Sequence, residues 1–255
     1  MFIVWGKKAV YRKLGYVADF CTICRRARPF LVRRIGMAGH VYYISAGEGE
    51  LVGYDRTCQS CATSYPADPA RYRSMAKKLA PLPELVAQTF PDFQAAWADR
   101  LALEEQVRSS PMLVPAEQRK SLLLESFLAL SPKVERRFAS THLDKEVGFA
   151  VLGTIGLLVA LPALTRAVAP DHAEEAVLLA MAVGIALVVW QIAVFGRRFM
   201  RRDVVPVLVK SLNPLRPRKE EMAGILAELK SHGHKMGAKL KLTDLLEGLG
   251  STPSR

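Results

Sequence analysis

Two long runs of uncharged, mostly apolar residues constrain the fold of this 255-residue chain more than any other feature. They cover residues 147–165 and 176–196, which is nineteen and twenty-one residues without a charged side chain. As helices they extend roughly 28 and 31 Å, close to the ~30 Å hydrocarbon core of a bilayer. A helix pair in a soluble core rarely needs so many uncharged residues. The sequence therefore predicts an integral membrane protein with a two-helix transmembrane hairpin, whose spans cover about 147–166 and 174–196.

The charges around the hairpin predict its orientation. The loop between the spans, residues 166–175, holds only Arg166 and three acidic residues. The flanks are basic on both sides, with Lys133, Arg136, Arg137 and Lys145 before the first span and Arg197, Arg198, Arg201, Arg202, Lys210 and Arg216 after the second. Because Lys and Arg are enriched in cytoplasmic loops, both termini are predicted to be cytoplasmic. In the loop, Asp171 followed by Glu174 resembles a capping box that opens the second helix, and Pro170 precedes it.

The four cysteines carry the clearest chemical signal. They form two CxxC pairs separated by 33 residues: Cys21, Cys24, Cys58 and Cys61. Two residues between the cysteines let a tight turn direct both thiolates at one ion, and two such turns complete a tetrahedron. Soft thiolates favour zinc or iron. The sequence predicts a structural zinc centre with these four ligands, because four thiolates leave no coordination position for water or substrate.

Other interpretations of the cysteines are weaker. Thioredoxin-like redox pairs need a helix after each CxxC. Pro29 and the strand expected after it argue against such a helix after the first pair. Haem attachment needs a histidine after the second cysteine, where Arg25 and Ala62 stand. A four-thiolate iron site for electron transfer stays open. The apolar start of the chain is too short for a secretory signal, so we expect a reducing compartment, which favours a metal over disulfides.

Segments around the first cysteine pair resemble a known family. Phe2-Ile3-Val4-Trp5-Gly6, Leu14-Gly15-Tyr16 and Arg28-Pro29-Phe30, together with the CxxC pairs, are similar to the start of a family of bacterial zinc-ribbon proteins, many of them uncharacterised. The resemblance covers roughly residues 2–65. It implies a β ribbon around zinc, the four cysteines as ligands, and a bacterial plasma (inner) membrane for the hairpin. The family often carries glycine after each CxxC, which eases a positive φ, and here Arg25 and Ala62 take that place.

Four segments are predicted along the chain: a zinc-ribbon domain (1–65), a small helical cytoplasmic domain (66–146), the transmembrane hairpin (147–196) and a basic helical cytoplasmic tail (197–255). The expected fold class is mainly α with a small N-terminal β zinc ribbon. Strands are expected in residues 30–34, 40–45 and 50–55. Helices are expected to begin near Asp68-Pro69, Pro91, Pro115 and Ser131-Pro132. Residues 204–212 are expected to lie along the membrane surface, and Gly153, Gly156 and Gly184 to allow close packing within the hairpin.

Charge and motifs limit the function. The chain has 36 Lys and Arg against 24 Asp and Glu, a net charge of +12, and residues 1–40 hold nine basic residues against the single acid Asp19. Basic segments suit anionic membrane lipid or nucleic acid. No catalytic or cofactor-binding motif stands out, and the spans contain no charged residue that would mark a transporter. The sequence favours a non-enzymatic, membrane-tethered adaptor that binds a cytoplasmic protein. The alternative is a membrane-anchored nucleic-acid-binding regulator.

Overall fold

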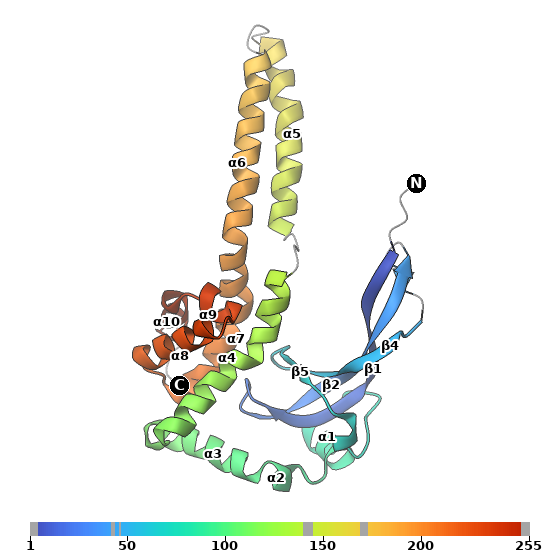
Figure 1. The fold of residues 1–255 in the computed structure, drawn as a ribbon, viewed down its shortest axis with the longest axis vertical. Coiled ribbons are helices and arrows are strands. Elements are labelled where there is room, and N and C mark those ends of the chain that lie inside the picture. The colour runs from blue at the N-terminus through green and yellow to red at the C-terminus, as the bar shows by residue number, and fades with distance from the viewer. Residues whose placement is uncertain (1–4, 42–43, 46, 140–144, 169–172, 251–255) are drawn as a thin grey trace. The chain divides into compact units, whose positions relative to one another are not determined.

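A computed structural model describes residues 5–41, 44–45, 47–139, 145–168 and 173–250. The described part is mainly helical, with an antiparallel sheet near the N-terminus and two long apolar helices (Figure 1), as the sequence predicted at this level. The chain divides into two compact units, which are described separately below. Unit 1 comprises Met1–Leu130 and Val207–Ile225, and unit 2 comprises Ser131–Pro206 and Leu226–Arg255.

The sheet of unit 1 is built around one long antiparallel ribbon. Its strands are β1 (Trp5–Cys21), β2 (Arg26–Val41), β3 (Ile44–Ser45), β4 (Glu50–Cys58) and β5 (Ser64–Pro66). The strand order is β1-β2-β4-β5, and β3 pairs with β2. β1 and β2 pair along nearly their whole length, from Trp5 opposite Val41 to Cys21 opposite Arg26 (Figure 1). β1 therefore forms one edge of the sheet.

β1 is a strand that the sequence pattern did not reveal. Its first half carries Lys7, Lys8, Arg12 and Lys13, all exposed, so basic side chains lie on both faces and the apolar–polar alternation of a half-buried strand is missing. Its second half is different, because Val17, Ala18 and Phe20 are buried. Among the described residues, the outer edge of β1 is paired only at Tyr16, which exchanges two backbone hydrogen bonds with Ala76.

The helical elements of unit 1 follow the sheet. They are η1 (Pro69–Arg71), α1 (Leu82–Thr89), α2 (Phe93–Ala96), α3 (Ala98–Ser109), η2 (Pro111–Leu113), the first part of α4 (Ala116–Ala139), most of α7 (Val205–Leu212), η5 (Asn213–Leu215) and the first part of α8 (Lys219–Ser231). The helix expected from Asp68 is only the single 3-10 turn η1, capped by Asp68 through a 3.0 Å hydrogen bond from the Ala70 amide. No new helix begins at Pro132, which lies inside α4.

α7 corrects another expectation. Its apolar residues Leu208, Val209 and Leu212 are buried within the protein, so this face is not available to a membrane surface. A buried hydrogen bond of 2.8 Å joins Ser211 Oγ of α7 to Ser126 Oγ of α4. The packing of α7 therefore belongs to the core of unit 1.

Residues beyond position 65 complete the core on β1. Ala18, Ala76 and Leu85 form a buried cluster, and the Ala18 amide donates a 3.0 Å hydrogen bond to Thr89 Oγ1 of α1. The Phe20 ring packs 5.2 Å from the ring of Trp97. These contacts cross the expected boundary between the first two segments. The four-segment division itself stays a prediction.

A buried carboxylate connects β1 to the helical part. Asp19 is fully buried and pairs with Arg56 of β4. Its two oxygens also accept hydrogen bonds from Tyr72 Oη at 2.6 Å and from Trp97 Nε1 at 3.0 Å. A carboxylate without such partners is costly to bury, because it loses its water. Asp19 therefore joins two strands to the segment that follows the sheet.

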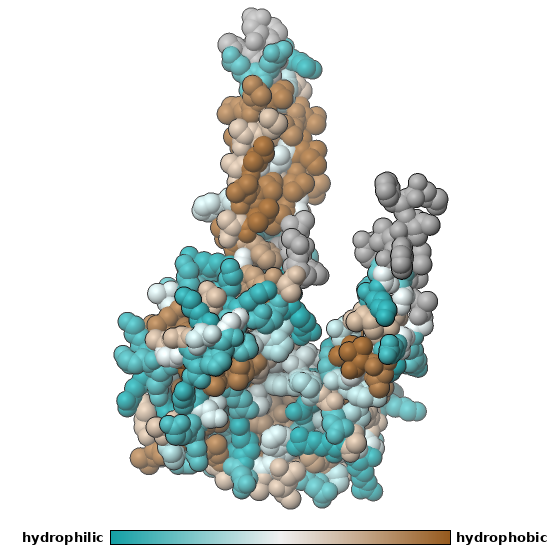
Figure 2. All heavy atoms as spheres, in the orientation of Figure 1, coloured by the Kyte–Doolittle hydropathy of each residue, from teal (hydrophilic) through white to brown (hydrophobic). Residues whose placement is uncertain are grey.

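Unit 2 contains the two long apolar helices. α5 (Lys145–Val168) and α6 (Ala173–Phe199) run side by side (Figure 1). Both are long and apolar enough to cross a membrane, and only 11% of the apolar window of each is buried. Large apolar side chains such as Phe149, Leu152 and Leu178 are exposed along them. Figure 2 shows hydrophobic side chains over much of the surface of these two helices. The helices therefore lack the burial of a soluble core. Asp171, the expected N-terminal residue of the capping box, and Pro170 before it lie outside the described residues.

Shorter helical segments make up most of the remaining described part of unit 2. A π-helical segment (Met200–Val204) follows α6, and α9 (Lys235–Lys239) and α10 (Leu242–Gly250) lie near the C-terminus. Acidic residues pair with arginines in the last turn of α6 and in the segment after it. Glu146 lies 2.7 Å from Arg202, and Asp244 lies 3.2 Å from Arg197.

α5 and α6 approach closely at Gly184. A Cβ atom at this position would overlap the side chain of Thr154, whose hydroxyl donates to the carbonyl oxygen of Ala150 at 2.7 Å and lies 3.4 Å from that of Gly184. At Gly153 and Gly156 a Cβ would meet nothing within 4 Å in the described chain. Of the three glycines expected to allow close packing, Gly184 alone does so between these helices.

Replacing Gly184 with leucine is expected to separate α5 from α6. The added side chain overfills a packed contact, which typically costs about 1–3 kcal/mol. The measurement is the thermal unfolding temperature of the full-length protein in detergent, together with its rate of proteolysis. Gly156→Leu is the matched control, because its side chain enters open space. Equal unfolding temperatures for the two variants would contradict the packing seen at Gly184.

Candidate metal centre

The four cysteines lie together in space. Their sulfur atoms are all within 4.8 Å of one another, and those of Cys21 and Cys61 are 3.6 Å apart. Zn–S bonds of ~2.3 Å at tetrahedral angles give an S–S separation of roughly 3.8 Å. A disulfide would bring two sulfurs to ~2.05 Å, whereas all four cysteines are free. The donor set therefore fits one tetrahedral ion, and the predicted meeting of the four cysteines is confirmed.

The sheet brings the two pairs together. Cys21 is the last residue of β1 and Cys24 lies in the turn to β2, whereas Cys58 is the last residue of β4 and Cys61 lies in the turn to β5. β2 stands between β1 and β4, with Cys58 paired to Phe30 near its start. Both turns therefore lie at the same end of the sheet. The 33-residue interval between the pairs is the length of chain needed to run along β2 and return along β4.

The two turns have matching backbone geometry. Arg25 follows the first pair with φ 55°, and Ala62 follows the second with φ 56°. The amide of Arg25 donates to the carbonyl of Cys21 at 2.7 Å, and that of Ala62 to the carbonyl of Cys58 at 2.9 Å. Residues with a Cβ adopt this left-handed conformation at a cost of about 1–2 kcal/mol. Arg25 and Ala62 thus form the turn that glycine would form with less strain.

Hydrogen bonds surround the sulfurs. The amides of Cys24 and Ser60 donate to the sulfurs of Cys21 and Cys58, each at 3.4 Å. Hydrogen bonds with Cys21 and then Cys58 lower the pKa of Cys24 to about 7. Hydrogen bonding with Cys24 and the other two cysteines, together with burial, raises the pKa of Cys21. The thiols of Cys21 and Cys24 therefore hold their protons with unequal strength, because the pKa of Cys21 is raised and that of Cys24 is lowered. A metal ion would displace those protons, so its affinity is expected to rise with pH.

Tyr65 is a residue of the site that the sequence analysis missed. Its hydroxyl lies 3.6 Å from the sulfur of Cys21 and 3.1 Å from Thr22 Oγ1, and its ring packs edge-on against Phe30. Burial raises the pKa of Tyr65, so the hydroxyl keeps its proton and can donate a hydrogen bond to a thiolate. Tyr65 is 44 residues from Cys21, and no local pattern marks it. Beside it lies a surface groove of about 260 Å³, lined by Thr22, Tyr65, Ser121, Leu124, Glu125, Leu128 and Ala129.

Replacing Tyr65 with phenylalanine is expected to weaken zinc binding about 10-fold, because groups that hydrogen-bond to metal ligands typically contribute 10–100-fold in affinity. The ring and its packing against Phe30 are retained, so the change removes only the hydroxyl. Competition with a chromophoric chelator measures the affinity. Tyr54→Phe, on β4 of the same sheet, serves as the control. An unchanged affinity in Tyr65→Phe would remove this hydrogen bond from the account of the site.

The described chain thus combines a four-cysteine candidate metal centre on an antiparallel sheet with two exposed apolar helices. Comparisons of the chain with protein-family models, with curated proteins and with solved structures give no match. The resemblance to bacterial zinc-ribbon proteins therefore stays a prediction. Phe2, Ile3 and Val4 of its opening segment lie outside the described residues.

Proposed function

We propose that this chain is a membrane-anchored zinc-ribbon adaptor that presents a cytoplasmic surface to another protein, and that it is not an enzyme. One observation carries the proposal: four free thiols within 4.8 Å occur in the same chain as two helices whose apolar sides are exposed. Four thiolates complete the coordination of zinc and leave no position for substrate. Such a centre stabilises a fold, and the fold then supplies the binding surface.

The membrane part of the proposal rests on exposure and charge. The apolar sides of α5 and α6 need a solvent other than water, and a bilayer supplies it. Trp190, 65% exposed near the end of the second apolar run, suits a position at the membrane surface. The basic residues Arg197, Arg198, Arg201 and Arg202 come next and suit the anionic cytoplasmic face of a bacterial plasma membrane. In this arrangement both termini are cytoplasmic.

The pairing of the basic residues favours a protein partner over nucleic acid. Several arginines of the first forty residues pair with carboxylates of the same chain, which reduces the charge available to phosphate groups. Arg25 pairs with Glu104, Arg33 pairs with Asp55, and both Arg12 and Arg34 pair with Glu48. The positive charge that the sheet offers to phosphate groups is therefore smaller than its count of basic residues indicates.

The test uses the full-length protein, first in isolated membranes and then purified in detergent. We expect one zinc ion per chain by metal analysis, and retention in membranes after an alkaline carbonate wash. We also expect crosslinking to a protein partner that survives nuclease and is lost in the Cys21→Ser/Cys24→Ser variant. Recovery that collapses with nuclease would favour the regulator that binds nucleic acid. A visible absorption band from iron–thiolate charge transfer would show that the bound metal is iron and not zinc.

A further inference from the structure

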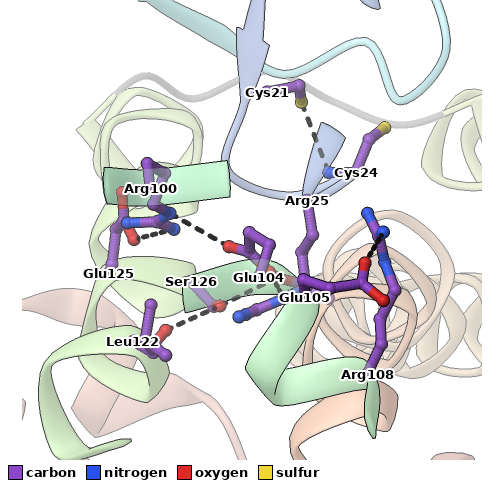
Figure 3. Close-up of polar contacts among 11 residues, drawn as sticks. Cys21, Cys24, Arg25, Arg100, Glu104, Glu105, Arg108, Leu122, Glu125 and Ser126 are labelled. Atoms are coloured by element: carbon purple, nitrogen blue, oxygen red, sulfur yellow. Dashed lines mark hydrogen bonds and ion pairs between the residues drawn. The ribbon is translucent and has the colours of Figure 1, made fainter. Parts of the chain in front are cut away.

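Arg25 links the first cysteine turn to a buried carboxylate. Its side chain extends from the residue after Cys24 toward α3 (Figure 3), where Arg25 Nε donates to Glu104 Oε2 at 2.7 Å. The two side chains are 5% and 2% exposed. Both terminal amino groups of Arg25 are buried and donate no hydrogen bond within the described residues. The carboxylate of Glu104 is therefore the principal partner of this arginine.

Glu104 is itself held in place. Its second oxygen, Oε1, accepts a 3.0 Å hydrogen bond from Arg100 Nε, and Arg100 Nη2 reaches Glu125 of α4 at 2.6 Å (Figure 3). Arg100 also packs over the ring of Phe20, with 5.1 Å between the guanidinium carbon and the ring centroid. Two helices and a strand thus fix the carboxylate that Arg25 contacts. Charge-assisted hydrogen bonds in such a dry place are directional and hold geometry well.

The second cysteine turn supplies the comparison. Ala62 has the same left-handed backbone as Arg25 and makes the same hydrogen bond to its cysteine carbonyl, but its side chain ends at Cβ. The backbone of the first turn is as strained as that of the second. Only the first turn carries an ionic contact to the rest of unit 1.

We propose that Arg25 and Glu104 are positioning residues for the metal centre. Their ion pair holds the first turn in the conformation that directs Cys21 and Cys24 at the ion, so the metal affinity depends on a residue 79 positions away in sequence. By linkage, metal binding in turn strengthens the docking of α3 on the sheet. This inference rests on the metal centre proposed above and adds a connection between that centre and the helices that cover it.

The test compares zinc affinities of full-length variants in detergent, measured by competition with a chromophoric chelator. Arg25→Gly and Ala62→Gly relieve the same backbone strain, but only the first removes an ion pair. We expect Arg25→Gly to weaken zinc binding about 10–100-fold and Ala62→Gly to leave it unchanged or tighter. Glu104→Gln, which keeps the shape of the side chain, is expected to weaken it similarly. The double variant is expected to lose little more than Arg25→Gly, because the two residues act as one unit.

A second control separates positioning from general stability. Arg119→Gln breaks another largely buried pair of unit 1, in which Arg119 Nε lies 2.6 Å from Glu221. We expect its zinc affinity to match the wild type. The inference is overturned if Arg25→Gly and Glu104→Gln bind zinc as tightly as Ala62→Gly, or if Arg119→Gln weakens binding as much as they do. A wild-type protein that binds no zinc would overturn the proposed centre itself, and the inference with it.

Discussion

Replacing Cys58 with serine is expected to abolish tight zinc binding and to unfold the end of the sheet that carries the cysteines. Cys58 is buried and paired with Phe30 in the β2–β4 ladder, so the loss of its thiolate removes both a ligand and the link between two strands and the ion. Because zinc binding contributes directly to folding in such sites, a loss of roughly 1,000-fold in affinity corresponds to about 4 kcal/mol of stability.

Chelator competition and near-ultraviolet circular dichroism of the full-length protein in detergent check this expectation. Complete chelation of zinc from the wild type should reproduce the spectrum of Cys58→Ser. Ser60→Ala is the matched control, since Ser60 is an exposed residue of the same turn and contributes only its amide to the site. A wild-type spectrum that survives complete chelation would show that the sheet folds without the ion.

Replacing Asp19 with alanine is expected to destabilise unit 1 by about 3–5 kcal/mol, the usual cost of removing one partner from a buried ion pair. The change strands Arg56 without its carboxylate and leaves the hydroxyl of Tyr72 and the indole N–H of Trp97 without their acceptor. Urea unfolding of the full-length protein in detergent, followed by tryptophan fluorescence, gives the free energy of unfolding.

Asp68→Ala provides the scale for that measurement. Asp68 is an aspartate of the same unit, but it caps a single exposed 3-10 turn, and losing such a cap costs only ~1 kcal/mol or less. If the two variants unfold at the same urea concentration, the buried network around Asp19 contributes no more than a surface cap.

The features that the sequence predicted are the local ones. The spacing of two residues within each cysteine pair predicts a tight turn, and the two apolar runs predict two long helices, although α5 and α6 both extend beyond the runs. The errors also have local causes. Asp68-Pro69 carries the signature of a helix start, yet the segment after it forms one turn and then pairs with Tyr16 of β1 through Ala76. At Pro132, α4 continues past the lost amide, with Leu130 and Val134 buried on either side of it.

The residues that the sequence did not predict act across long separations. Tyr65 contacts Cys21, Glu104 contacts Arg25, and Trp97 contacts Asp19, over 44, 79 and 78 positions respectively. No spacing rule joins such pairs, because the tertiary fold brings them together. Asp19 had one clue, since it is the single acid among the basic residues of the first forty. A single carboxylate in a basic segment has several possible basic partners. In the structure Asp19 is buried and pairs with Arg56 of β4.

The outer edge of β1 affects how copies of a membrane-anchored protein can associate. Anchoring confines copies of a protein to two dimensions, where neighbours meet often and in the same orientation. In the described chain, the edge before Tyr16 has no strand beside it, and open edges of this kind tend to pair with one another. The exposed side chains of Lys7, Lys8 and Lys13 would place positive charges opposite positive charges in any such pairing. For the anchored protein proposed here, this positive charge along the strand edge opposes the edge-to-edge association of neighbouring molecules into fibres.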